Sequence, residues 1–192
     1  MIGSFIGVGF HHILSPDALD HILFLAALAA CYRPKDWRHG LAVISAFTIG
    51  HTLTLALTTL TPLRPPTALI EFLIPITVVI AALDNFRTRG DLPSGPRRPL
   101  LAGAFGLIHG AGFSTTLRGL FDDGIITPLL GFNIGIELGQ VVVLTSLVML
   151  YVALDRLVDA TGRDGWTLRV RLASAVVASA ALVLAMERAP WV

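Results

Sequence analysis

The sequence has little charge for its length. Of its 192 residues, 14% are charged and 54% are hydrophobic, and the mean hydropathy is +0.76. In an ordinary soluble domain about a quarter of the residues are charged. We therefore predict an integral membrane protein, with one transmembrane domain over residues 1–192 and the lipid bilayer as its surroundings.

Other scarcities exclude further classes of protein. The single cysteine, Cys31, excludes an internal disulfide and a cysteine-rich metal site. The net charge is only +1 and the basic residues lie between apolar segments, so no nucleic-acid partner is expected. The sequence also has no Gly-x-Ser-x-Gly motif, Walker loop or Cys-x-x-Cys motif. A serine hydrolase, an ATP-driven pump and thiol redox chemistry are therefore unsupported.

Long apolar runs are the most prominent feature that is present. They predict an all-α polytopic membrane bundle of about six transmembrane helices, at about 16–32, 38–60, 67–86, 100–121, 125–157 and 168–186. Residues 1–14 are also apolar, but as a helix they would reach only about 21 Å, which is short of a bilayer core. We expect them to form a short interfacial or re-entrant segment.

The basic residues predict how the chain is oriented. Eleven of the fourteen fall in loops on one predicted side, namely Arg33, Lys35, Arg38, Arg87, Arg89, Arg97, Arg98, Arg156, Arg163, Arg169 and Arg171. The other side has Arg64, Arg118 and Arg188. Because basic loops stay on the cytoplasmic side, both termini are expected on the outer side of the membrane.

The predicted helix over 125–157 has two distinct stripes. Three polar residues at i, i+4 and i+7 share one face: Asn133, Glu137 and Gln140. Three glycines share roughly the opposite face: Gly131, Gly135 and Gly139. Such a glycine stripe lets another helix approach backbone to backbone in lipid. It also suggests a homo-oligomer formed through glycine-rich helix faces.

Ionisable residues inside the apolar segments are the candidate functional groups, because they are costly in lipid. His51, His109 and Glu137 each lie about 10 to 12 residues from the predicted outer helix end, so about 15 to 18 Å deep. Imidazoles and carboxylates suit zinc, nickel or cobalt. The predicted metal ligands are His12, Asp20, His21, His51, His109 and Glu137, supported by Thr48, Glu71, Asn133 and Gln140.

Simpler interpretations of the same residues exist. Each histidine could be a core residue that is hydrogen-bonded to a neighbouring helix, and Glu137 could be a neutral carboxyl group bonded to Gln140. Asn133 and Gln140 could join helices without binding a ligand. Asp20 and His21 are adjacent in sequence and therefore point about 100° apart on a helix, so only one of them is expected to contact the ion directly.

Five ordered motifs carry a family resemblance. They are Gly9-x-x-His12-Ile13, Asp20-His21-Ile22-Leu23-Phe24, Phe47-Thr48-x-x-His51-Thr52, Gly106-Leu107-x-His109-Gly110-x-Gly112-Phe113 and Gly131-Phe132-Asn133-x-Gly135-x-Glu137-x-Gly139-Gln140. Together they resemble the second branch of the HupE/UreJ family of bacterial membrane proteins. The resemblance implies a multi-pass protein of the bacterial inner (plasma) membrane that is linked to nickel or cobalt uptake for hydrogenase and urease. In that membrane the charge bias described above places both termini on the periplasmic side.

The chain departs from the family pattern at two places. The family's His-x5-Asp-His motif would fall on His12, Asp20 and His21, but here seven residues separate the first two. The better-studied branch has a second histidine and a glutamate after its His-Gly, where this chain has Gly112-Phe113-Ser114. The resemblance therefore implies the family more firmly than it implies nickel as the substrate.

Two functions compete at this stage. The first is a permease for a divalent transition cation (nickel, cobalt or zinc), which would use an outer-facing site. The alternative is an intramembrane zinc-dependent hydrolase that acts on a lipid or a lipid-linked substrate. A metal sensor or accessory subunit is a third reading. The permease is preferred, although the inner halves of the helices offer few polar groups beyond Asp84 and Asn85.

Overall fold

The computed structural model describes residues 2–88, 95–117 and 126–191, and within them it is all-α, as predicted. The seven helices are α1 (Ile2–Leu14), α2 (Leu19–Cys31), α3 (Trp37–Leu60), α4 (Thr67–Asp84), α5 (Arg97–Leu117), α6 (Ile126–Asp159) and α7 (Gly165–Glu187). Short 3-10 turns lie at Pro16–Ala18, Pro34–Asp36 and Asn85–Arg87. No strand occurs in these described ranges.

Within the described residues, four helices are long and apolar enough to cross a membrane: α3, α4, α6 and α7. The helix predicted from residue 16 begins instead at Leu19, because Pro16–Ala18 forms a tight turn. With 13 residues, α2 is too short to span alone, but α1 and α2 together make a bent pair with an angle of 71° and a fifth candidate span. The predicted span over 100–121 corresponds to α5, and its predicted outer end extends past the described residues.

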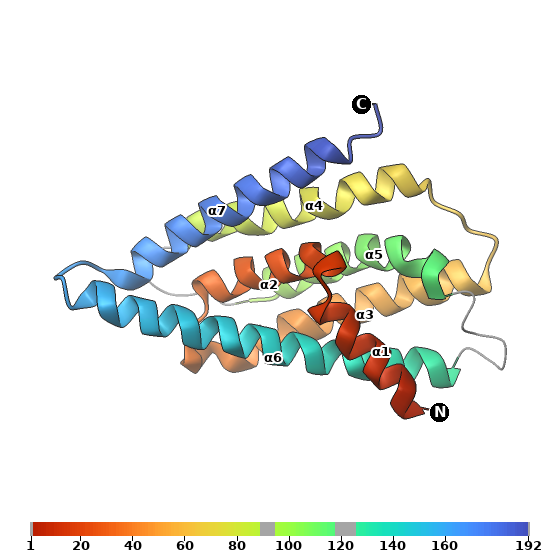
Figure 1. Cartoon of the computed structure of the whole chain (residues 1–192), viewed down its shortest axis with the longest axis horizontal. Coiled ribbons are helices and arrows are strands. Elements are labelled where there is room, and N and C mark those ends of the chain that lie inside the picture. The colour runs from red at the N-terminus through yellow and green to blue at the C-terminus, as the bar shows by residue number, and fades with distance from the viewer. Residues whose placement is uncertain (1, 89–94, 118–125, 192) are drawn as a thin grey trace.

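The helices run roughly along the long axis of the molecule, with α2 near the middle (Figure 1). α1 packs on α6, α3 packs on α5, and α4 packs on α7, while α2 contacts α4, α6 and α7. In Figure 1 the links from α2 to α3 and from α6 to α7 lie at the left, whereas both chain termini lie toward the right. The termini thus share one end of the bundle, and the membrane side of that end remains a prediction.

Close backbone contact at glycines builds the pairing of α1 with α6. A Cβ atom added at Gly135 would overlap the carbonyl oxygen of Ile6, and one at Gly131 would lie 2.9 Å from the carbonyl oxygen of Ile2. The predicted packing role of the glycine stripe is therefore confirmed, and the partner is a helix of the same chain. This face is no longer available for the predicted contact between copies.

The pairing of α3 with α5 uses the same device. A Cβ atom at Gly106 would overlap the carbonyl oxygen of Phe47, and one at Gly110 would overlap that of His51. The two glycines on either side of His109 therefore hold α5 against the backbone of α3. This close approach sets His109 at the depth of His51.

Candidate metal centre

Three histidines from three different helices meet inside the bundle. His12 comes from the end of α1, His21 from the start of α2 and His51 from the middle of α3. One ring nitrogen from each can be chosen so that all three lie within 4.8 Å of one another. The ring centroids of His12 and His21 are 5.0 Å apart, and those of His21 and His51 are 6.2 Å apart. The chain thus gathers imidazoles that are up to 39 positions apart in sequence.

Ring nitrogens of His21 and His51 lack hydrogen-bond partners among the described residues. His51 is fully buried, and among the described residues neither its Nδ1 nor its Nε2 has a hydrogen-bond partner. The buried Nε2 of His21 also has none within those residues. A buried polar atom without a partner costs about 1–3 kcal/mol. A protein can tolerate this cost where a bound ligand satisfies the polar atom. Neutral imidazole nitrogens are common ligands for transition metals.

A fourth imidazole stands beside this group. The ring of His109 on α5 lies 5.1 Å from that of His21, and its Nε2 lies 3.0 Å from the hydroxyl oxygen of Thr77 on α4. The Thr77 hydroxyl donates its single hydrogen to the carbonyl oxygen of Ile74 at 2.7 Å. With that hydrogen on Ile74 O, the Thr77 oxygen accepts a hydrogen bond from His109 Nε2–H. In this tautomer the buried Nδ1 of His109, which has no hydrogen-bond partner among the described residues, keeps a lone pair for a metal.

Phenylalanine rings pack against the histidine cluster. The ring of Phe132 on α6 lies 5.7 Å from that of His12 and 6.4 Å from that of His51. Phe47 lies 5.0 Å from His109. Both phenylalanines are almost completely buried. They give the imidazoles no hydrogen-bonding alternative and keep water away, which strengthens any electrostatic interaction with an ion.

The polar stripe of α6 lies at a different interface. Glu137 accepts a hydrogen bond from Ser45, and Asn133 accepts one from Thr52. Gln140 Oε1 accepts a hydrogen bond from the Thr48 hydroxyl at 3.0 Å. These three pairs join α3 to α6 beside a lateral groove of about 490 Å³. Within the described residues, the histidine group includes no carboxylate. The structure therefore does not bring Glu137 into the group, where it was expected.

Two further predicted site residues, Asp20 and Glu71, are not in the histidine group that the described residues form. Asp20 is buried, and its Oδ2 accepts a hydrogen bond from Arg188 at 2.8 Å, an ion pair between the start of α2 and the end of α7. Glu71 is exposed on α4. The Thr48 hydroxyl oxygen also lies 3.1 Å from the carbonyl oxygen of Ile44 within its own helix. The supporting residues thus act on the helix framework around the cluster.

Sequence reasoning missed the residues that orient the cluster. Thr77 gave only a weak signal, as one hydroxyl in the apolar run over 67–86. Arg188 was counted only as a basic residue near the outer surface, and Phe132 was noted only as part of a motif. Their roles depend on which helices face one another, and a single sequence does not specify that arrangement.

Comparisons with known proteins support the motif reading. A family model described as HupE / UreJ protein matches residues 1–192. No curated protein matches the chain, and no solved structure matches it.

Proposed function

The chain belongs to the HupE/UreJ family, which is associated with nickel and cobalt transport, and from this premise we propose that it is a permease for a divalent transition-metal cation. The observation that carries the proposal is the meeting of His12, His21 and His51, with ligand atoms that lie within 4.8 Å of one another. The cation is the transported substrate. The three imidazoles bind it, and His109 supplies a fourth nitrogen beside them.

The donor set suits the proposed substrate. Imidazole nitrogen binds nickel, cobalt and zinc well, whereas magnesium and calcium prefer oxygen. In a tetrahedral site with metal–nitrogen distances of about 2.1 Å, the ligand nitrogens lie about 3.4 Å apart. Side-chain rotations that move the ring nitrogens by about an ångström would therefore close the cluster on an ion, because imidazoles pivot about two side-chain bonds. Donor type alone leaves nickel, cobalt and zinc as alternatives.

An inward route is supported by the layer below the histidines. Phe24 stacks on Phe47 at 4.8 Å between ring centroids and lies 6.5 Å from Phe105. A small cavity of about 20 Å³ is lined by Phe24 and Phe105 together with Asp84 and Arg98. This cavity connects the aromatic layer with polar residues of the opposite end. Movement of the phenylalanines would open the route in the proposed mechanism.

The alternative hydrolase receives less support from the same geometry. That chemistry needs a carboxylate or another base within hydrogen-bond reach of a metal-bound water. Asp20 pairs with Arg188, and Glu137 is bonded to Ser45 at the interface between α3 and α6. The permease is therefore the function that the described residues favour.

Transport is tested directly in proteoliposomes. We expect the purified protein to carry nickel, cobalt or zinc into vesicles faster than protein-free vesicles do, measured with an enclosed metal-sensitive dye. The His51→Gln protein, reconstituted at equal density, is expected to lose at least nine-tenths of this flux, because even the loss of an outer-shell partner weakens metal binding about 10- to 100-fold. No flux of any of the three ions, with or without a proton gradient, would contradict the proposal.

Thr77 provides a finer prediction. Replacing Thr77 by Val removes the hydroxyl that orients His109 but keeps the side-chain shape, so metal affinity should fall about 10- to 100-fold, as for other outer-shell partners. Thr77→Ser keeps the hydroxyl and should retain the affinity of the parent. Isothermal titration with Co²⁺ measures both. Equal affinities for the two variants would show that Thr77 does not orient a ligand.

A further inference from the structure

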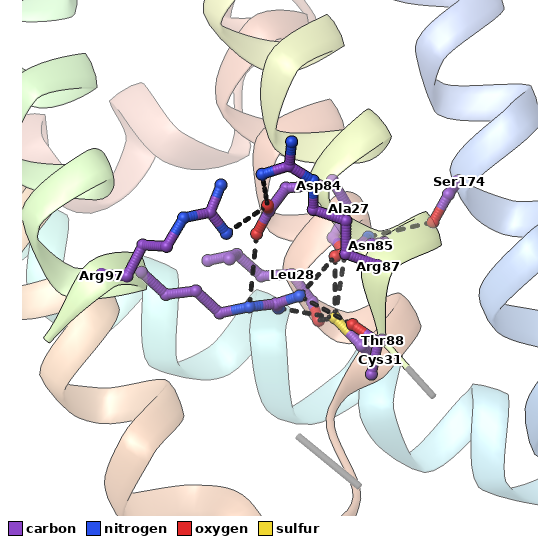
Figure 2. A network of polar contacts seen from close by, with 10 residues as sticks. Ala27, Leu28, Cys31, Asp84, Asn85, Arg87, Thr88, Arg97 and Ser174 are labelled. Carbon is purple, nitrogen blue, oxygen red and sulfur yellow. Dashed lines mark hydrogen bonds and ion pairs between the residues drawn. The ribbon is translucent and has the colours of Figure 1, made fainter. Parts of the chain in front are cut away.

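The opposite end of the bundle contains a buried guanidinium surrounded by donor atoms. Arg98, in the first turn of α5, is only 7% exposed. Its Nη1 lies 2.9 Å from Cys31 Sγ, and its Nη2 lies 3.0 Å from Thr88 Oγ1 and 3.3 Å from Asn85 Oδ1. Its Nε lies 3.6 Å from a carboxylate oxygen of Asp84. Figure 2 shows Cys31, Asp84, Asn85 and Thr88 grouped around this contact network.

The atoms around the guanidinium form a set that could bind a metal. They are a carboxylate oxygen, a carboxamide oxygen, a hydroxyl oxygen and a thiol sulfur, and sulfur and oxygen ligands of this kind hold transition cations elsewhere. Cys31 is fully buried and Asn85 is 2% exposed. Because the orientation of Asn85 is fixed by donation from Nδ2 to Ala27 O at 2.7 Å and to Ser174 Oγ at 2.9 Å, its Oδ1 points at Arg98.

This donor set lies on the route proposed above. Asp84 and Arg98 line the small cavity that Phe24 and Phe105 also line. His21 and Cys31 are ten residues apart on the same helix, about 15 Å along its axis. A cation that leaves the histidines and passes the aromatic layer would reach this carboxylate next. The group is therefore separate from the histidine site, and the cavity extends from it to Phe24, which packs against His109.

We propose that Cys31, Asp84 and Asn85 form a second metal site at the inner end, and that Arg98 fills it as a tethered cation when no metal is there. This inference deepens the proposed transport function and rests on it. When the metal binds, the Cys31 thiol releases its proton to water and its sulfur forms the bond to the metal. The guanidinium leaves the donors at the same time. Arg98 thus keeps the inner end closed between transport events.

Asp84 is suited to switch between the two cations. Arg97 donates to Asp84 Oδ1, and Arg87 Nη1 lies 4.0 Å from the same oxygen, whereas Arg98 approaches Oδ2. Arg87 and Arg97 have largely exposed side chains, and that of Arg98 is buried. Arg87 and Arg97 can therefore remain paired with Oδ1 of Asp84 while a metal binds Oδ2 in place of Arg98.

Cobalt absorption separates the inner site from the outer one. A thiolate bonded to Co²⁺ gives a sulfur-to-metal charge-transfer band, which a site made only of imidazoles does not give. Arg98→Gln removes the competing cation, so we expect this band to appear and bound cobalt to rise from about one to about two ions per chain. The double variant Arg98→Gln with Cys31→Ser should lose the band and the second ion.

Arg169→Gln is the matched control. Arg169 is another buried arginine at the same end, but it donates to the carbonyl oxygen of Tyr32 at 3.3 Å and pairs with Asp155, so it does not occupy the donor set. Its variant should bind cobalt without the charge-transfer band. A band of equal strength in Arg169→Gln and Arg98→Gln would overturn the proposal, because it would show general loosening of the inner end.

Two further results keep the inner site independent of the outer one. The double variant His51→Gln with Arg98→Gln should keep the band although the histidine site is weakened. No band in folded Arg98→Gln, with one ion still bound in the parent, would overturn the inner site and leave the proposed permease intact. If Arg98→Gln does not fold, Arg98→Lys can be used instead. The lysine ammonium lacks the planar group of donors with which the guanidinium contacts four residues. The charge-transfer band should therefore appear in Arg98→Lys at saturating cobalt. Its absence in a folded Arg98→Lys protein would also overturn the inference.

Discussion

Replacing His51 by Gln is expected to reduce the metal held by the purified protein from about one ion per chain to less than about a tenth of that. The reason is that a direct ligand should matter more than an outer-shell partner, whose loss costs about 10- to 100-fold in affinity. His51 is fully buried, and among the described residues both of its ring nitrogens lack hydrogen-bond partners. Elemental analysis after dialysis at fixed free nickel, cobalt or zinc measures the change.

His11 provides the matched control for this substitution. It lies beside His12 on α1 but is exposed, and it is not part of the group with ligand atoms within 4.8 Å. His11→Gln should therefore retain the metal content of the parent. Equal losses of metal in the two variants would indicate that histidines bind the metal nonspecifically. Unchanged metal content in His51→Gln would remove His51 from the ligand set.

Gly135→Val is expected to have the second large effect, although it touches no ligand. Any side chain there overlaps the carbonyl oxygen of Ile6, so α1 must separate from α6. Overpacking of this kind costs about 1–3 kcal/mol and sometimes more. Because α1 carries His12, the same substitution should also lower the metal content. Thermal unfolding in detergent and elemental analysis on the same sample measure the two effects.

Gly7→Val distinguishes steric overlap from the general effect of adding valine to a glycine-rich protein. A Cβ atom at Gly7 on α1 meets nothing within 4 Å, so this variant should keep the thermal unfolding midpoint and the metal content of the parent. If Gly135→Val matched Gly7→Val in both measurements, α1 would not need to dock on α6 to complete the cluster.

Local patterns predicted much of the fold. Apolar runs predict helices because each run must satisfy its own backbone hydrogen bonds in lipid. The stripe of Gly131, Gly135 and Gly139 predicted a close helix contact because its spacing places all three on one face. The sequence did not tell which helix would fill that face. The partner is α1, a helix of 13 residues within the stretch that the sequence predicts to be a short interfacial or re-entrant segment.

The site was predicted in part, for a related reason. Buried histidines stand out in apolar segments, and His12, His21 and His51 do meet. Glu137 stood out equally but bonds Ser45, because the rotation of α3 about its axis decides whether its hydroxyls or His51 face α6. The pairing of Asp20 with Arg188 spans 168 positions. Contacts of that range depend on the packed bundle and leave no local pattern in the chain.

An X-ray absorption spectrum of the nickel- or zinc-loaded parent protein tests the central claim most directly, namely that imidazoles of His12, His21 and His51 hold the ion together. The predicted spectrum has a first shell dominated by nitrogen at about 2.0–2.1 Å, with the outer-ring scattering of at least three imidazoles. His51→Gln loaded at higher metal should lose one imidazole. A first shell of oxygen with no imidazole scattering in the parent would contradict the account.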